Sequence, residues 1–215
     1  MINKIDKFFQ EGYFILINKK KKIMKFQNII SSHIQEHKDV INSFDDKMIE
    51  KIENISNVLI NSLSKGNTIF WCGNGGSAGD SQHLATELIG RFHKDRRPLK
   101  SLALTTDSSA ITCISNDFSF ENIFERQIEG LGVKGDVLVG ITTSGNSANI
   151  INAFKKCSEI GVTSVGFLGK DGGAAKDFAN YSLIIESDST ARIQEMHIMV
   201  GQICCDLIEH GLSLK

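Results

Sequence analysis

Two loops of small residues, each placed between an apolar run and a helix-like stretch, constrain this chain more than any other feature of its sequence. The first is Gly73–Ser77 (GNGGS) and the second is Thr142–Ser147 (TTSGNS). Such loops let backbone N–H groups converge, and the helix that follows adds unpaired donors and the positive end of its dipole. The sequence therefore predicts two anion-binding loops, for which a phosphorylated small molecule is the natural ligand.

The apolar runs around these loops predict a parallel sheet. Several of the runs lack the polar alternation of a half-exposed strand, and helix-like stretches separate them. An alternation of fully apolar strands with helices is typical of a sheet covered by helices on both sides, with ligands bound beyond the carboxyl ends of the strands. We expect strands at 68–72, 101–104, 137–142, 163–168 and 183–186, and helices at 78–92, 109–115, 121–129, 148–160 and 190–210.

The chain ahead of the first predicted strand divides into helices and an appended segment. From Met24 to about Lys65, apolar residues recur at helical spacing with a break near residues 42–45, which predicts two amphipathic helices. Residues 1–23 differ from the rest in their charge pattern, because lysine occupies every position from 19 to 22, just ahead of Met24. We interpret them as an extension outside the core, upstream of a natural start at Met24. A basic arm that touches a membrane is the alternative.

Composition limits the partners of this chain. Its 215 residues are 41% hydrophobic, enough for one globular domain, which we place at 24–215. With 24 Lys and Arg against 25 Asp and Glu, the net charge is −1, which offers no basic field for nucleic acid or an anionic membrane. The five cysteines lie scattered in apolar runs, as is typical of a reducing cytoplasm. We therefore expect a cytoplasmic protein with no nucleic-acid or membrane partner.

Two common nucleotide-binding motifs fit these loops poorly. A Walker A loop has a lysine after its last glycine, and neither loop has one. Gly73, Gly75 and Ala78 match the dinucleotide fingerprint as it is written. However, the acid at the end of the next predicted strand, Asp107, lies much further along the chain than the typical spacing of about 20 positions. The sequence therefore argues against both nucleotide hydrolysis and NAD binding.

The helix predicted after the first loop carries candidate chemistry. His83 and Glu87 are four positions apart, so they project from one face of a helix within reach of each other. An imidazole and a carboxylate beside a phosphate site can transfer protons or hold a metal. A surface pair without function is the alternative, although both residues lie on the helix whose start forms the first loop.

The only proline of the chain marks a turn before the second predicted strand. It follows two arginines in the sequence Arg96-Arg97-Pro98. Proline favours a turn, and charged side chains in a turn are usually solvated. We therefore expect the charges of Arg96 and Arg97 to face water.

Six motifs in order along the chain carry a specific resemblance. They are CGNGGSA at 72–78, QHLATELIGRF at 82–92, NDF at 116–118, TTSGNS at 142–147, GKDGG at 169–173 and ARIQEMH at 191–197. Together they resemble the phosphoheptose isomerases, a branch of the sugar-isomerase (SIS) superfamily. The resemblance runs from about Met24 to the C-terminus, and His83 with Glu87 favours this branch.

The resemblance implies a fold, an assembly and a reaction. The fold is α/β and flavodoxin-like, with a five-stranded parallel sheet, and it forms a homotetramer with active sites at subunit interfaces. The reaction converts D-sedoheptulose 7-phosphate, a phosphorylated seven-carbon sugar, into D-glycero-D-manno-heptose 7-phosphate. This step leads toward ADP- or GDP-heptose for lipopolysaccharide, capsule or another glycoconjugate. Because ketose–aldose interconversion moves a proton between adjacent carbons through an enediolate, it needs a base beside those carbons.

The resemblance also assigns roles to residues. Glu87 matches the catalytic base of the family, and the hydroxyl-rich loop at 142–147 matches its phosphate-binding loop. Arg91 is a candidate for reaching the ligand of a neighbouring subunit, with an interfacial ion pair as the alternative. The complete set of expected substrate contacts is Asn74, Gly75, Gly76, Ser77, Glu87, Arg91, Asn116, Asp117, Thr142, Thr143, Ser144, Ser147 and Gln194.

A metal and a second proton carrier depend on the last predicted helix. Several members of the family carry Zn²⁺ at this site, bound by positions matching His83, Glu87, Gln194 and a histidine at the place of Gln202, which implies one zinc ion per subunit here. An amide cannot act as an acid or base near neutral pH, although its carbonyl oxygen can still ligate a metal less well than imidazole. Gln202 therefore leaves a weaker zinc site or none.

Two proton-transfer schemes remain open after that substitution. Glu87 can work with solvent, or His197 can replace the missing histidine as the second carrier. Helical geometry alone does not choose between His197 and Gln202, since both lie within about 80° of Gln194 around the helix. The alternative for His197 is a structural histidine on a packed helix.

A different class of function also has to be considered. A related SIS protein, which binds the bacterial replication initiator, is a tetrameric regulator and not an enzyme. This chain would then be a non-catalytic tetramer that binds a sugar phosphate or a replication initiator. The lineage of that regulator lacks the glutamate at the position of Glu87, so Glu87 favours the enzyme.

Overall fold

The computed structural model describes residues 24–212, so the predicted extension at 1–23 lies outside the described residues. Contacts divide the chain into two units, with the boundary between Ser43 and Phe44. In the first unit, residues 24–42 form one helix. The second unit begins with α2 (Asp46–Ser64), in which Asp45 caps the first turn by accepting a hydrogen bond from the backbone N–H of Met48. These two helices confirm the predicted pair, and the domain boundary at 24–215 stays a prediction.

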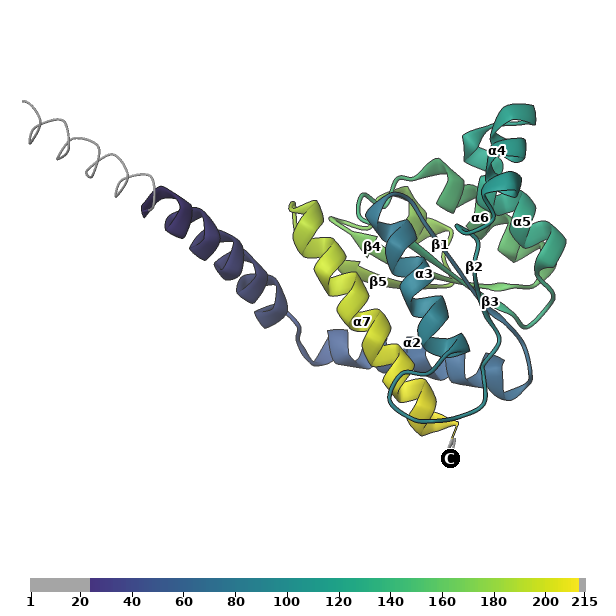
Figure 1. Cartoon of the computed structure of the whole chain (residues 1–215), viewed down its shortest axis with the longest axis horizontal. Coiled ribbons are helices and arrows are strands. Elements are labelled where there is room, and N and C mark those ends of the chain that lie inside the picture. Colours follow the sequence, from purple (N-terminus) through teal and green to yellow (C-terminus); the bar gives the residue numbers. More distant parts are fainter. Residues whose placement is uncertain (1–23, 213–215) are drawn as a thin grey trace, which may run out of the picture. The chain divides into compact units, whose positions relative to one another are not determined.

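A five-stranded parallel sheet lies at the centre of the second unit (Figure 1). The strand order is β2-β1-β3-β4-β5, and every neighbouring pair is parallel. From β1 the chain moves to one side to form β2 and to the other side to form β3, so the order reverses between β1 and β3. This confirms the flavodoxin-like sheet. The strands are β1 (Ile69–Gly73), β2 (Ser101–Ala103), β3 (Val137–Thr142), β4 (Thr163–Gly169) and β5 (Tyr181–Ile185).

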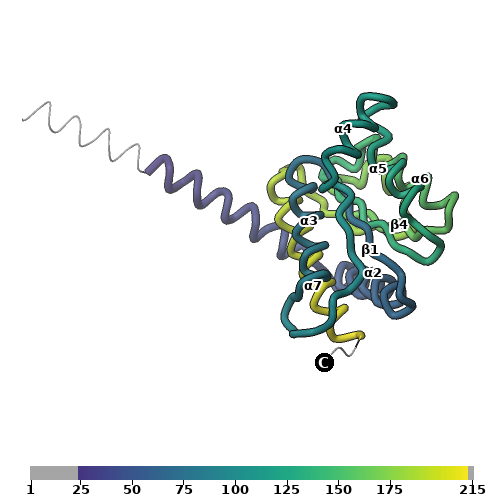
Figure 2. Tube along the Cα trace, turned by 45° about the vertical axis from the view of Figure 1, so that its right-hand side comes forward, coloured from purple at the N-terminus to yellow at the C-terminus, as the bar shows by residue number. Residues whose placement is uncertain are grey.

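Helices cover both faces of this sheet (Figures 1 and 2). The helices α2, α3 and α7 pack together on one face, and α4, α5 and α6 lie on the other. Two short 3₁₀ turns, η1 (Phe120–Asn122) and η2 (Ala174–Asp177), complete the connections. The remaining helices are α3 (Gly76–Ile89), α4 (Ser108–Asp117), α5 (Ile123–Leu131), α6 (Ala148–Ile160) and α7 (Thr190–Gly211).

The core explains why the central strands have no polar alternation. All six residues of β3 are buried, because helices cover it from both sides. Gly140 lies where the ring of Phe154 on α6 approaches the strand, and a Cβ atom there would come within 2.6 Å of that ring. Trp71 of β1 is fully buried, and its indole N–H donates to the hydroxyl of Ser101 at 2.9 Å. Among residues 24–212, no helix is long and apolar enough to cross a bilayer.

α3 and α7 run side by side in the same direction, as Figure 1 shows. Near the start of α3, a Cβ atom on Gly76 would lie 2.5 Å from Oε1 of Gln194. Two turns further on, a Cβ atom on Gly201 of α7 would collide with the side chain of Leu84. In both contacts, the residue of α7 follows its neighbour on α3 by nearly the same number of positions along the chain. Position 202 of α7 therefore lies level with the part of α3 between His83 and Glu87.

Candidate active site

The two predicted loops meet at the carboxyl ends of β1 and β3, where the strand order reverses. Gly73 pairs with Ile141 in the sheet, so the loops leave the sheet beside each other. The first loop is tight, because α3 begins at Gly76 directly after Gly75, whose φ of 56° favours glycine. A Cβ atom on Gly73 would lie 2.5 Å from the carbonyl oxygen of Ser77. Small residues are therefore a steric requirement of this turn.

Hydroxyl groups gather in the second loop. Oγ1 of Thr142 lies 2.9 Å from Oγ of Ser147 and 3.3 Å from Oγ of Ser144. The Ser144 oxygen also accepts a hydrogen bond from the backbone N–H of Asn146 at 3.1 Å. These hydroxyls lie at the start of α6, where backbone donors and the helix dipole favour an anion. Thr143, the fourth hydroxyl of the predicted phosphate loop, is partly exposed.

The GKDGG segment and the two alanines that follow it pack against this hydroxyl loop. The backbone N–H of Ala175 donates to the carbonyl of Gly145 at 2.8 Å, and that of Ala174 donates to the side chain of Asn146 at 3.0 Å. Gly145 has a φ of 66°, and a Cβ atom there would collide with the carbonyl of Gly172. Sequence reasoning used this motif only as part of the resemblance. The motif contacts the hydroxyl loop because β4, which precedes the motif, ends next to β3, which precedes the loop.

Asn74 joins the first loop to the helix that follows the second. Its side-chain amide exchanges two hydrogen bonds with the amide of Asn149, at 3.0 Å and 2.8 Å. Asn149 lies in the first turn of α6 and is buried. Sequence reasoning missed Asn149, because only the fold brings residues so distant along the chain together. Its place two residues beyond the hydroxyl loop was the one available signal.

His83 and Glu87 contact each other on α3, as their spacing predicts. Nε2 of His83 lies 2.8 Å from Oε1 of Glu87. The side chain of Glu87 is 19% exposed and that of His83 is 53% exposed, so solvent or a ligand can reach both. Arg91, two residues beyond the end of α3, is exposed.

Gln194 lies against the first turn of α3, next to a carboxylate that sequence reasoning missed. Its Nε2 group donates to Oδ1 of Asp80 at 3.5 Å. Asp80 is buried, and Oδ2 of this side chain has no hydrogen-bond partner among the described residues. Burial raises the pKa of Asp80 above its ordinary value, although the bond from Gln194 and the nearby His83 oppose the shift. The signal in the sequence was its spacing, three residues before His83 and seven before Glu87.

The two candidates for a second proton carrier on α7 have different surroundings. Gln202 is partly exposed and level with the His83–Glu87 pair. His197 is fully buried, and its Nε2–H donates to the carbonyl of Leu168 in β4 at 3.0 Å. Burial lowers the pKa of His197 to about 4, against the effect of that carbonyl. This geometry favours the structural interpretation of His197.

Asn116 and Asp117 lie at the exposed end of α4. The side-chain amide of Asn116 donates to Oδ1 of Asp117 at 2.8 Å, and the thiol of Cys113 donates to Oδ2 at 3.4 Å. Within the described part of the chain, these side chains form no hydrogen bond with the loops or with the His83–Glu87 pair. Their predicted contact with sugar stays a prediction.

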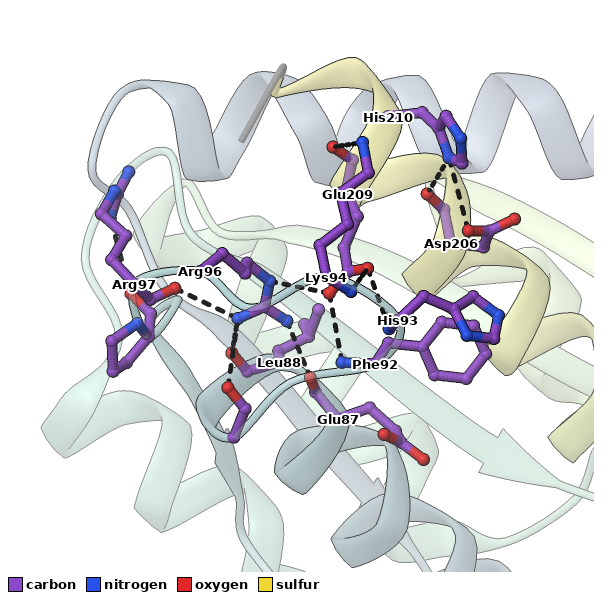
Figure 3. Close-up of polar contacts among 12 residues, drawn as sticks. Glu87, Leu88, Phe92, His93, Lys94, Arg96, Arg97, Asp206, Glu209 and His210 are labelled. Atoms are coloured by element: carbon purple, nitrogen blue, oxygen red, sulfur yellow. Dashed lines mark hydrogen bonds and ion pairs between the residues drawn. The ribbon is translucent and has the colours of Figure 1, made fainter. Parts of the chain in front are cut away.

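A buried ion pair fastens the end of α3 to the end of α7 (Figure 3). Nε of Arg96 donates to Oε1 of Glu209 at 2.9 Å, and both side chains are 0% exposed. The other guanidinium nitrogens of Arg96 donate to the backbone carbonyls of Leu88 and Glu87, each at 2.8 Å. The expectation that Arg96 faces water is therefore wrong. The guanidinium satisfies carbonyl groups that the end of the helix leaves without partners.

Glu209 completes this cluster from α7 (Figure 3). Its carboxylate accepts hydrogen bonds of 2.9 to 3.1 Å from three successive backbone N–H groups, those of Phe92, His93 and Lys94. Burial by itself would raise the pKa of Glu209. The three N–H groups and the charge of Arg96 outweigh it and hold the pKa below its ordinary value. The connection after α3 is thus fixed by α7.

The parallel sheet, the paired loops and the helix that carries His83 and Glu87 define an SIS-domain protein, and the SIS domain family matches residues 32–169. A phosphoheptose isomerase of Clostridium acetobutylicum is 49% identical over 85% of this chain and 92% of its own length. One from Aquifex aeolicus is 46% identical over 81% and 92%. A solved phosphoheptose isomerase from Neisseria gonorrhoeae has a TM-score of 0.82 and 37% identity, over 86% of this chain and 99% of its own. This chain belongs to the phosphoheptose isomerase family.

Breaking the Arg96–Glu209 pair from either side should destabilise the protein strongly. We expect Arg96→Met or Glu209→Gln alone to lower the free energy of unfolding by about 3 to 5 kcal/mol, because each leaves a buried charge without its partner. The double variant should lose less than the sum of the two. Urea unfolding followed by circular dichroism measures this. Glu159→Gln, which removes an exposed partner of Lys156, is the control and should change little. Single variants as stable as this control would contradict the assignment.

The buried state of His197 predicts a dependence of stability on pH. Its folded pKa of about 4 lies below the ordinary value of 6.5, so the unfolded chain binds more protons between these limits. The stabilisation is complete above pH 6.5 and falls by about 3 kcal/mol as the pH falls to 4. His197→Gln keeps an N–H donor for the backbone carbonyl of Leu168 and removes the ring that titrates.

The experiment compares urea unfolding of the wild type and of His197→Gln across this pH range. The variant should lose less stability than the wild type as the pH falls. His210→Gln, which removes a solvent-exposed histidine near the end of α7, is the matched control for the loss of one imidazole. Equal slopes for the wild type and His197→Gln would show that folding does not lower the pKa of His197.

Proposed function

We propose that this chain isomerises D-sedoheptulose 7-phosphate to D-glycero-D-manno-heptose 7-phosphate, the ketose–aldose reaction implied by its family. The observation that carries this proposal is the partly exposed carboxylate of Glu87, 2.8 Å from His83 on the helix that begins at the first loop. The hydroxyl loop at the end of the neighbouring strand supplies the complementary part, an anchor for the phosphate. An anchor and a base at a fixed separation are what the reaction of a phosphorylated sugar requires.

Glu87 acts as the base in this mechanism. With the phosphate held by Thr142, Ser144 and Ser147, the carboxylate removes a proton from C1 of the ketose while the carbonyl oxygen at C2 gains one, which gives the enediol. Return of the proton to C2 and loss of the hydroxyl proton at C1 give the aldose. His83 orients the carboxylate through their contact, and Asn74 and the glycine backbone bind the sugar.

Water carries the second proton in this proposal. Gln202 lies level with the His83–Glu87 pair, but an amide has no proton to exchange near neutral pH. His197 is remote from solvent and donates its ring N–H to a backbone carbonyl. We therefore give His197 no part in proton transfer, and Glu87 works with solvent between the two oxygens.

We also propose a weak Zn²⁺ site at the same place. His83 and Glu87 offer an imidazole and a carboxylate on one helix face, and Gln194, which contacts Asp80 one turn before His83, offers an amide oxygen. The described residues contain no group of three or more histidine, cysteine, aspartate or glutamate side chains gathered to hold a metal. The donors thus fit zinc only in part, and Gln202 would add a poor fourth ligand. When bound, zinc would polarise the oxygens of the sugar.

The assembly, location and pathway belong to the same proposal. A homotetramer with shared active sites would bring Asn116 and Asp117 of one subunit to the sugar bound by another. Cytoplasmic location is supported by five free cysteines, four of them buried. The product would feed ADP- or GDP-heptose synthesis for lipopolysaccharide or capsule. The regulator remains the second candidate function, and the presence of Glu87 argues against it.

Glu87→Gln tests the base directly. We expect kcat to fall by about a hundredfold or more, because the amide keeps the shape of the side chain but cannot accept the proton. Conversion of sedoheptulose 7-phosphate to the aldose is followed by NMR. Glu129→Gln, an exposed position on α5, is the control and should retain full activity. Retained isomerisation by a folded Glu87→Gln would remove Glu87 from the mechanism, and an inactive wild type would favour the regulator.

Gln202→His tests the zinc site without relying on activity. Restoring an imidazole level with the His83–Glu87 pair should tighten zinc binding by about tenfold or more. Competition with a chromophoric chelator measures the dissociation constant. The control is Gln127→His on α5, which covers the face of the sheet opposite to the His83–Glu87 pair. Equal zinc affinity for the wild type and Gln202→His would show that position 202 does not face the metal.

A further inference from the structure

A reciprocal pair of side-chain amides connects the first loop to the helix that follows the second. Nδ2 of Asn74 donates to Oδ1 of Asn149 at 3.0 Å, and Nδ2 of Asn149 donates back to Oδ1 of Asn74 at 2.8 Å. Asn149 is 3% exposed. Each amide thus uses one donor and one acceptor on the other. Asn74, which is partly exposed, keeps one N–H and one lone pair for a ligand.

The pair spans the point where the strand order reverses. Asn74 directly follows β1 and precedes Gly75 and Gly76, which have no side chains that could fasten this part of the loop. Asn149 belongs to α6, which starts at the end of the hydroxyl loop. The loop after β1 is therefore fastened to the first turn of α6, and through it to the hydroxyls that would bind phosphate.

The chemistry of this contact points to positioning and not only to packing. A buried amide loses its bonds to water and must recover them from the protein, so an apolar pair would fill the same space at lower cost. A reciprocal amide pair is directional, because both bonds form only when the two planes align. Such a contact fixes the orientation of Asn74 as well as its distance from α6.

We propose that Asn149 is a positioning residue that couples phosphate binding to the placement of the sugar. It holds Asn74 and the glycine loop at a fixed distance from the hydroxyl loop, so that a phosphate anchored there brings the reacting carbons to Glu87. The inference rests on the proposed isomerase function. Asn149 itself contacts neither the phosphate nor the reacting carbons, and acts through Asn74.

Kinetics of three variants test this coupling. Asn149→Ala removes the partner of Asn74, and the nearly isosteric Asn149→Asp replaces its donor with an acceptor. We expect kcat/KM for sedoheptulose 7-phosphate to fall by about tenfold to a hundredfold in both, mainly through kcat, because the sugar is misplaced. Asn152→Ala is the matched control, since Asn152 lies one turn further along α6 and donates at 3.2 Å to the carbonyl of Glu121.

A double variant separates positioning from general loss of structure. If Asn149 acts through Asn74, the combination of Asn74→Ala with Asn149→Ala should reduce kcat no more than the worse single change. Additive losses would overturn the proposal, and so would Asn149 variants within twofold of the Asn152→Ala control. A wild type and control that both lack isomerase activity would instead reject the proposed function.

Hydrogen–deuterium exchange tests the coupling independently of turnover. In the wild type, saturating inorganic phosphate should slow amide exchange in residues 142–147 and also in residues 73–79. In Asn149→Asp the first segment should still respond, and the second should not. The same response of both segments in the variant, or no response of residues 73–79 in the wild type, would show that the amide pair transmits nothing.

Discussion

The parallel pairing of β1 with β3 is the constraint on which the rest of this structure depends. It places Gly73 beside Ile141, so two loops far apart in the sequence leave the sheet at one edge and from neighbouring strands. One loop carries hydroxyls and the other carries almost no side chains. The hydroxyl loop and the helix that carries Glu87, which we propose as phosphate anchor and source of the base, therefore keep a separation that the backbone hydrogen bonds of the sheet fix.

Contacts at both ends of α3 hold this helix, and with it Glu87, in place relative to the hydroxyl loop. At the start of the helix, the Asn74–Asn149 pair ties its loop to α6. At the end, Arg96 binds the carbonyls of Glu87 and Leu88 and is itself held by Glu209 of α7. If Glu87 is the base, as we propose, its helix is held at both ends and needs little reorganisation during the reaction, which is the usual advantage of a preorganised site.

The substitution at position 202 has a definite place in this arrangement. The parallel course of α3 and α7 sets Gln202 level with the His83–Glu87 pair, where the resemblance expects a histidine. An amide at this position bears on the proposed proton transfer and metal site, in which Glu87 works with solvent.

Local patterns predicted the elements, because buried strands and amphipathic helices have periodicities that a short window of sequence contains. The five strands, the two loops and the His83–Glu87 contact were predictable in this way. Arg96 was misjudged, and Asp80 and Asn149 were missed, because burial and long-range hydrogen bonds depend on partners more than 70 residues away for Asn149 and more than 110 for Arg96 and Asp80.

The sequence by itself determined the class of fold and the chemistry available, since residue types and spacings carry both. Only the tertiary structure decided which polar groups are buried together, which carboxylate is accessible and which histidine is locked to a backbone carbonyl. The physical reason is that the cost of burying a polar group, and the partner that offsets it, are set by neighbours in space and not by neighbours in sequence.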